Sequence, residues 1–231
     1  MKIKIIQGNN NDLKASDINV VIDVIRAFTV AHYAFIHGTK EIFLVNSVEE
    51  GFNYKQKNPQ FLLAGEVNGL PIEGFDLDNS PLSVIKSDLQ GKTLIQKTTN
   101  GVKGTLNSLN ADAIFVTGFT NARTTARYIH QISHMQKKNI QINIIASHPT
   151  GDDDLACAEY IKSIIENKNS VSAEDVKKRI ENSHVAAKFY DDTRPEFNRE
   201  DISLCTRVVD SNFVMKVNTS SLIPKIERIN I

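Results

Sequence analysis

Short apolar runs alternate with amphipathic stretches along the first two thirds of the chain. The runs are apolar at consecutive positions, as in INVVIDV at residues 18–24, which is typical of strands covered on both faces. This pattern predicts strands over Ile18–Val24, Glu41–Val45, Phe61–Gly65, Thr93–Gln96, Ala113–Thr117 and Ile140–Ala146. The spacing between them predicts helices over Ala27–His37, Val48–Lys57 and Asn121–Lys138.

The last third of the chain changes to mainly helical spacing. It predicts helices over Asp152–Glu166, Ala173–Asn182 and Asp201–Val209, then a strand over Phe213–Val217. The polar break at residues 168–172 is too short to mark a domain boundary. Strand–helix–strand repetition implies a mostly parallel sheet between two layers of helices. We therefore expect residues 1–231 to form a single α/β/α domain with a helical C-terminal portion.

Composition and charge narrow the classes of partner. The 231 residues contain 27 basic and 27 acidic side chains, so no global field attracts nucleic acid or an anionic membrane. Neither a signal peptide nor a membrane-spanning run is recognisable, and Cys157 and Cys205 lie in apolar helical patterns. We expect a cytoplasmic protein with buried thiols. The sequence leaves open whether the chain forms a homo-oligomer.

Polar residues follow the ends of several predicted strands. In a parallel sheet, the carboxyl ends of the strands share one edge, where active sites collect. The polar residues at these positions are Asp23, Arg26, Glu66, Thr98, Thr99, Asn100, Gly101, Thr117, Asn121, His148 and Asp154. We expect them to share that edge of the sheet.

The residue types suit a phosphate group and a hard metal ion. The Arg26 guanidinium forms a planar fork for phosphate oxygens, Thr98 and Thr99 supply hydroxyl donors, and Gly101 leaves backbone N–H groups accessible. Carboxylates provide the oxygen ligands that Mg²⁺ prefers, and the candidates are Asp23, Glu66, Asp76 and Asp154. Zinc is not favoured, because there is no HExxH spacing and no cysteine pair.

Each of these signals also has a structural interpretation. Asp23 and Arg26 can form a simple ion pair at a strand end, and TTNG at residues 98–101 can serve as a turn and helix cap. Ser80 before Pro81 is an ordinary helix start, and residues 152–154 can complement a helix dipole. The functional interpretation depends on their shared position at one edge.

Several segments in sequence order resemble the 2-phosphosulfolactate phosphatase family. They are VVIDVIRAFTVAHYAFIHGTKEIFLVNSVEE, GEVNGLPIEGFDLDNSP, TTNG, VTGFTNARTTARYI, DDLACAEYI and DISLCTRVVD, between residues 18 and 215. The combination of DVxRA, GFDxxNSP and TTNG is far more specific than any one of these motifs.

The resemblance implies Mg²⁺-dependent hydrolysis of 2-phospho-3-sulfolactate to 3-sulfolactate and phosphate, a step in coenzyme M synthesis. It implies Asp23, Arg26 and Asp76 as catalytic residues, and Asp23, Asp76, Asp154 and Glu66 as metal ligands. Substrate-binding positions would be Thr98, Thr99, Asn100, Gly101, Asn79, Ser80 and Asn121. Whether Asp23 attacks phosphorus or holds Mg²⁺ stays open.

The chain also departs from the family pattern. Val67 stands where an arginine is expected, and the other departures are at Asp78, Lys97, Lys103 and Glu159. Losing an arginine that could bind an acid group leaves two further hypotheses open. One is a phosphatase for another small phosphorylated hydroxy acid, and the other is a non-catalytic protein that binds a phosphorylated metabolite.

Overall fold

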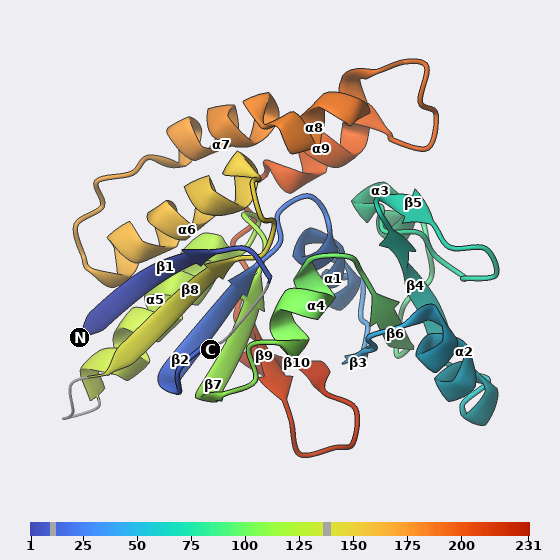
Figure 1. The fold of residues 1–231 in the computed structure, drawn as a ribbon, viewed down its shortest axis with the longest axis horizontal. Coiled ribbons are helices and arrows are strands. Elements are labelled where there is room, and N and C mark those ends of the chain that lie inside the picture. The colour runs from blue at the N-terminus through green and yellow to red at the C-terminus, as the bar shows by residue number, and fades with distance from the viewer. Residues whose placement is uncertain (10–12, 136–139) are drawn as a thin grey trace.

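The computed structural model describes residues 1–9, 13–135 and 140–231. Within these residues the strands form one sheet in the order β1-β8-β2-β7-β9-β10-β3-β6-β4-β5 (Figure 1). The strands are β1 Lys2–Gln7, β2 Ser16–Ile22, β3 Glu41–Leu44, β4 Leu62–Val67, β5 Leu70–Pro71, β6 Thr93–Lys97, β7 Ala111–Thr117, β8 Gln141–Ala146, β9 Phe213–Asn218 and β10 Lys225–Asn230.

The sheet consists of two parallel blocks. Strands β1, β8, β2 and β7 pair in parallel, and so do β3, β6 and β4. The antiparallel hairpin of β9 and β10 lies between the blocks, because β9 pairs with β7 and β10 pairs with β3. The C-terminal strands therefore join the two blocks into one sheet.

Helices follow most of the strands. They are α1 Ala27–Ile36, α2 Val48–Lys57, α3 Pro81–Ile85, α4 Gly101–Leu106, α5 Ala122–Met135, α6 Asp152–Ile165, α7 Ala173–Asn182, α8 His184–Ala187 and α9 Arg199–Cys205, with a 3-10 turn η1 at Lys188–Tyr190. Figure 1 shows α6 to α9 gathered at one side of the molecule.

Both faces of the sheet are buried against helices. Along β2, Val20 and Ile22 belong to a core cluster that includes α5 and α6 residues, whereas Val21 belongs to a second cluster that includes α1 residues. Successive side chains of a strand point to opposite faces, so β2 is covered on both sides. This arrangement confirms the predicted α/β class with a mostly parallel sheet and explains why its strands are apolar at consecutive positions.

Several boundaries differ from the sequence predictions. Helix α9 covers Arg199–Cys205, not Asp201–Val209. The end of the predicted Asn121–Lys138 helix, at residues 136–138, lies outside the described residues. The sequence pattern does not predict strands β1 and β10. Polar residues interrupt the apolar ones in both segments, KIKIIQ and KIERIN, which is a weaker pattern than a continuous apolar run.

Cys157 and Cys205 are buried free thiols, as expected. Among the described residues, no helix is long and apolar enough to cross a membrane. The single-domain organisation and the cytoplasmic location stay predictions.

Candidate active site

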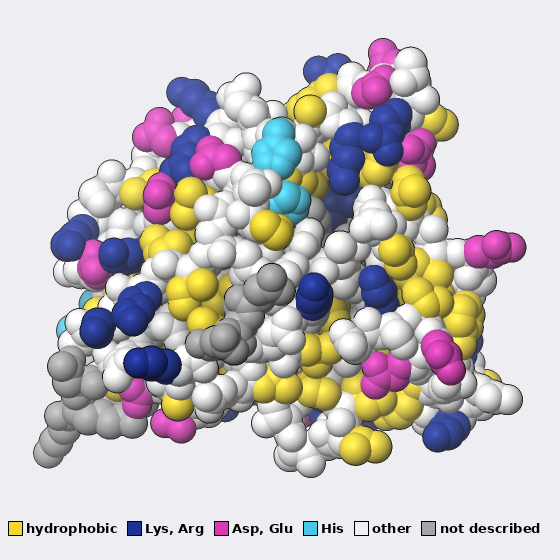
Figure 2. Space-filling model, viewed as in Figure 1, with side chains coloured by type: hydrophobic (Ala, Val, Ile, Leu, Met, Phe, Trp, Pro, Cys, Tyr) yellow, Lys and Arg dark blue, Asp and Glu magenta, His cyan; other side chains and the backbone are white. Residues whose placement is uncertain are grey.

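A pocket of about 410 Å³ opens at the carboxyl ends of β2, β4, β6 and β8. Its lining comes from six parts of the chain and consists of Asp23, Ile25, Arg26, Glu66, Asn68, Gly69, Asn79, Thr99, Asn100, His148, Pro149, Thr150, Val185, Lys188 and Phe189. In Figure 2, histidine side chains and a group of Lys and Arg side chains face each other across a hollow in the surface. The expectation of polar residues at one sheet edge therefore holds for the strand ends that line the pocket.

Asp23 lines the pocket and follows directly after the last residue of β2. Its Oδ1 accepts a hydrogen bond of 2.9 Å from the backbone N–H of Ala27 in α1. A Cβ atom at Gly101 would lie only 2.7 Å from Asp23 Oδ2, so the glycine allows the TTNG turn to approach the carboxylate. Burial raises the pKa of Asp23 to about 7, and the charges of Glu66 and Asp153 add to this effect.

Arg26 is buried and held from two sides. Its Nη1 forms a salt bridge of 2.8 Å with Asp201, and its Nη2 donates to the carbonyl of Gly69 at 3.0 Å. The guanidinium also lies 5.0 Å from the ring centroid of Phe189. The Ile25–Arg26 peptide bond is cis. A guanidinium has five N–H donors, so donors remain for a ligand in the pocket.

Glu66 connects two turns of the pocket wall. Its carboxylate accepts hydrogen bonds from the N–H of Gly69, the N–H of Thr99 and the hydroxyl of Thr99. Asn68 and Gly69 form the β4–β5 turn with positive φ angles of 54° and 84°, a conformation that Asn-Gly adopts readily. Asn68 N–H donates to Thr99 Oγ1 at 2.8 Å, which fixes the β4–β5 turn against the TTNG turn.

Two basic residues of the pocket are absent from the catalytic, substrate-binding and metal positions that the sequence indicates. Lys188 lies in η1, and burial lowers the pKa of its ammonium, as does the charge of Arg26. His148 accepts a hydrogen bond at Nδ1 from the N–H of Thr150, at 3.2 Å. In the neutral ring the proton is therefore on Nε2. Burial lowers the pKa of His148, with contributions from His184 and Lys188.

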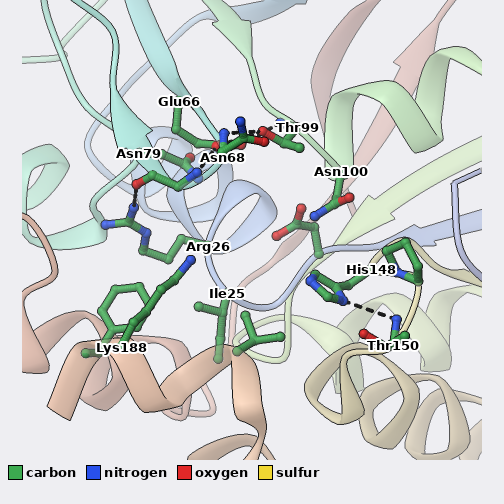
Figure 3. A pocket seen from close by; sticks show the side chains of 15 residues that line it. Ile25, Arg26, Glu66, Asn68, Asn79, Thr99, Asn100, His148, Thr150 and Lys188 are labelled. Atoms are coloured by element: carbon green, nitrogen blue, oxygen red, sulfur yellow. Dashed lines mark hydrogen bonds between the residues drawn. The ribbon is translucent and has the colours of Figure 1, made fainter. Parts of the chain in front are cut away.

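The labelled side chains of Figure 3 indicate how the pocket is divided. Arg26 and Lys188 lie on one side, and Asn100 and His148 lie on the other. Lys188 is unpredictable from the local sequence, because nothing near KFY at residues 188–190 marks a site. His148 does follow a predicted strand, and its position at the carboxyl end of a parallel strand is the sequence feature that could identify it as a site residue.

Asp76 is not brought to the pocket. Its carboxylate accepts a hydrogen bond of 2.7 Å from the N–H of Leu63 and forms a salt bridge with Lys55. The reason is the path of the preceding loop, which returns alongside β4 so that Leu77 pairs with Ala64 in parallel. Asp76 therefore lies near the beginning of β4 and not at its carboxyl end.

Four other predicted residues do not line the pocket, and their side chains form hydrogen bonds within the protein. Thr98 Oγ1 accepts from the N–H of Val102, and Ser80 Oγ donates to Asp201 at 2.6 Å. Asn121 Oδ1 accepts from the hydroxyl of Thr117.

Asp154 is the fourth, and it links two loops. It is buried and accepts from the N–H groups of Val24 and His148 and from the Ser147 hydroxyl. Burial and the charges of Asp153 and Asp23 raise its pKa. Asp154 thereby joins the loops that follow β2 and β8.

The departures from the family pattern have separate structural settings. Glu159 pairs with Arg179 of α7, and Asp78 accepts from the N–H of Ser80. Lys97 donates to the carbonyl of Glu66 at 3.4 Å, and the Val67 side chain is exposed. None of these four residues lines the pocket.

The oxygen donors of the pocket fit a Mg²⁺ ion that has few protein ligands. Among the described residues, no three His, Cys, Asp or Glu side chains form a metal-binding group. Mg²⁺ commonly uses one or two carboxylates together with phosphate and water oxygens. Asp23 and Glu66 line the same pocket, and the buried Asn79 Oδ1 has no hydrogen-bond partner among the described residues. A polar oxygen in that state is suited to an ion or a ligand.

Comparison with known proteins adds independent evidence. Residues 4–227 match the family model described as 2-phosphosulpholactate phosphatase. The chain belongs to this family. It is 52% identical to a probable 2-phosphosulfolactate phosphatase of Bacillus subtilis over 229 residues, which is 99% of both chains.

More distant relatives carry the same description. The chain is 37% identical to a probable 2-phosphosulfolactate phosphatase of Caldicellulosiruptor saccharolyticus, over 72% of this chain and 70% of the other. For one of Caldanaerobacter subterraneus the identity is 34%, over 74% and 70%. The 2-phosphosulfolactate phosphatase family is a family of phosphoric monoester hydrolases, and the chain is a member of that class of enzyme.

Proposed function

We propose that the protein hydrolyses 2-phospho-3-sulfolactate to 3-sulfolactate and phosphate, with Mg²⁺ in the pocket around Asp23. The observation that carries the proposal is the combination of carboxylates and cations in one pocket of a family member. Asp23 and Glu66 supply oxygen donors, whereas Arg26 and Lys188 supply positive charge. Family membership over nearly the whole chain supports the substrate.

The metal would be held by Asp23 and Glu66, with the Asn79 Oδ1 atom as a further donor. Bound there, Mg²⁺ would neutralise charge on the phosphoryl oxygens. Glu66 already accepts three hydrogen bonds, so its position is fixed before a ligand arrives. Such preorganisation reduces the reorganisation needed during the reaction.

Arg26 would orient the phosphoryl group. The Asp201 carboxylate and the Gly69 carbonyl fix the guanidinium, and the donors that they leave unused can reach phosphate oxygens. Thr99 and Asn100 line the same pocket and can donate further hydrogen bonds. These contacts would hold the phosphorus in line for attack.

The proposed reaction breaks the bond between phosphorus and the C2 oxygen. Its electron pair passes to that oxygen, which takes up a proton, and the oxygen of a water molecule ends on phosphorus. His148 presents a neutral Nε2–H in the pocket and can donate to a substrate oxygen. Asp23 either attacks phosphorus to form an acyl phosphate that water then hydrolyses, or serves only as a metal ligand.

A second candidate keeps the chemistry and changes the acid. Val67 stands where the family resemblance leads us to expect an arginine, and this departure leaves another small phosphorylated hydroxy acid as an alternative substrate, although Val67 itself does not line the pocket. If the substrate is 2-phospho-3-sulfolactate, the protein would act in coenzyme M synthesis and in the cytoplasm. A non-catalytic protein that binds a phosphorylated metabolite is the third hypothesis.

Phosphate release tests the proposal. The purified protein is incubated with 2-phospho-3-sulfolactate, 2-phospholactate and phosphoglycolate, each with Mg²⁺, with EDTA, and with EDTA followed by excess Mg²⁺. We expect release that is highest for phosphosulfolactate, stops in EDTA and returns with Mg²⁺. A different preferred acid would favour the second candidate, and no release from any acid by folded protein would leave the binding role.

A further inference from the structure

Lys188 is the pocket cation without an acidic partner among the described residues. Arg26 also carries positive charge, but its salt bridge with Asp201 already balances it. In the part of the chain that the structure describes, Lys188 forms neither an ion pair nor a hydrogen bond, although its ammonium lies in the pocket wall. A half-buried ammonium has lost part of its hydration, so an anion that reaches it is attracted more strongly than at an exposed lysine.

The surroundings of Lys188 hold its side chain in place. The Nζ atom lies 4.6 Å from the ring centroid of Phe197 and 5.8 Å from that of Phe189. Phe189, Phe197 and Ala186 belong to one buried cluster, which anchors the backbone on either side of the lysine. A positioned ammonium loses less entropy on binding than a free one does.

The pocket places Lys188 beside Arg26, on the side opposite the TTNG turn. Asp23 lies against Gly101, and Asn100 is the adjacent residue of the TTNG turn. In Figure 3, Lys188 lies on the side of the pocket opposite Asn100. A phosphoryl group that lies between Asp23 and Arg26 therefore leaves Lys188 within reach of the neighbouring acid groups of a three-carbon substrate.

The charges of the substrate require such a group. Phosphosulfolactate carries a carboxylate and a sulfonate besides its phosphate, and each must lose water when it enters the pocket. Asp23 and Glu66 would repel these groups. Of the described side chains that line the pocket, Lys188 carries a positive charge that forms no salt bridge.

We propose that Lys188 binds an acid group of the substrate other than the phosphate, the sulfonate or the carboxylate, and so sets the preference for doubly acidic substrates. This inference rests on the proposed function. Lys188 comes from η1, far along the chain from the strand-end residues of the pocket.

The test crosses variants with substrates. Lys188→Met removes the charge and keeps the apolar stem, Lys188→Arg restores the charge, and Lys178→Met on the exposed face of α7 is the matched control. The substrates are 2-phospho-3-sulfolactate, 2-phospholactate, which lacks the sulfonate, and 2-phosphooxyethanesulfonate, which lacks the carboxylate. Initial rates of phosphate release give kcat and KM for each pair, and thermal unfolding checks that each variant is folded.

We expect Lys188→Met to reduce kcat/KM for phosphosulfolactate at least about 10-fold, mainly through KM, because one charge-assisted hydrogen bond is lost. The substrate that lacks the group bound by Lys188 should be unaffected by the substitution, and this identifies the group. Lys188→Arg should recover most of the loss, and Lys178→Met should match the wild type.

An equal loss for all three substrates would overturn the inference, because Lys188 would then act on the phosphate or on the fold. No loss for any substrate would also overturn it. The wild-type rates decide the proposed function separately. If the wild type releases phosphate from phosphosulfolactate and Lys188→Met does so equally well, only the inference about Lys188 fails.

Discussion

Arg26 and Asp201 form a buried salt bridge with a separation of 2.8 Å, although 175 positions separate them in the chain. Asp201 also accepts hydrogen bonds from the Ser80 hydroxyl and the Leu82 N–H. One carboxylate in α9 thus joins the start of α1 to the start of α3. The C-terminal helical portion therefore fixes the guanidinium that we assign to phosphate binding.

Asp201→Asn should be strongly destabilising. The amide cannot accept from Arg26 and from Ser80 together, so it leaves a buried guanidinium without its counter-charge. We expect a loss of about 3–5 kcal/mol in the free energy of unfolding, measured by denaturant titration. Asp210→Asn breaks the exposed pair with Arg123 and is the matched control, with an expected loss below about 1 kcal/mol. Equal losses in the two variants would contradict this account.

Asn79 and Ser80 are neighbours with opposite expected effects. Asn79 Oδ1 has no partner among the described residues, so Asn79→Ala should change the free energy of unfolding by less than about 1 kcal/mol. It should nevertheless raise the Mg²⁺ concentration needed for half-maximal phosphate release. Ser80→Ala removes the cap of α3 and the bond to Asp201, and should cost about 1–3 kcal/mol. An unchanged Mg²⁺ requirement in Asn79→Ala would remove that residue from the site.

Asp76 should not be needed for activity, because the structure places it outside the pocket although the sequence predicts it as a site residue. Its carboxylate caps the N–H of Leu63 and pairs with Lys55. We expect Asp76→Asn to keep kcat/KM within about twofold of the wild type, since an isolated surface pair contributes little. A loss of roughly 100-fold or more would return Asp76 to the catalytic residues.

His32 should make stability fall in acid. Burial lowers the pKa of this histidine to about 3, so the folded protein holds the ring neutral. The unfolded chain binds a proton at His32 below about pH 6.5, so the contribution of His32 to the free energy of unfolding should fall by up to about 1.4 kcal/mol per pH unit from there toward pH 3. The raised pKa values of Asp23 and Asp154 act in the opposite direction, so the contribution of His32 is the difference between the wild type and a variant without it. Chemical denaturation of the wild type and His32→Asn at several pH values measures this slope. Between pH 6.5 and pH 3 the wild type should lose stability relative to the variant, and identical pH dependence in the two proteins would contradict the assignment.

The fold is predictable because its signal is local. Continuous apolar runs identify β2, β3, β4, β6, β7 and β8, and parallel pairing then places their polar ends at one edge. Asp23, Glu66, Thr99 and Asn100 reach the pocket for that reason. Family membership explains why the same motifs recur in this order.

The remaining parts of the site depend on long-range packing. Lys188 and Asp201 come from the helical portion, and no local pattern shows which side chains there turn toward the sheet edge. The sequence predicts Asp76 as a site residue, but the structure places it outside the pocket. The loop that carries it pairs in parallel with β4, and the sequence of the loop does not indicate this path. Local motifs therefore identify the strand-end residues, and tertiary contacts decide which of them line the pocket.

The most direct test of the central claim is phosphate release from 2-phospho-3-sulfolactate by the wild type and by Asp23→Asn, at saturating Mg²⁺. Asparagine keeps the size of the side chain and can still accept from the Ala27 N–H, so the variant should fold. We predict that kcat falls at least about 1000-fold, because an amide replaces the carboxylate that attacks phosphorus or holds the metal. A folded Asp23→Asn variant with near wild-type kcat would contradict the assignment of this pocket as the active site.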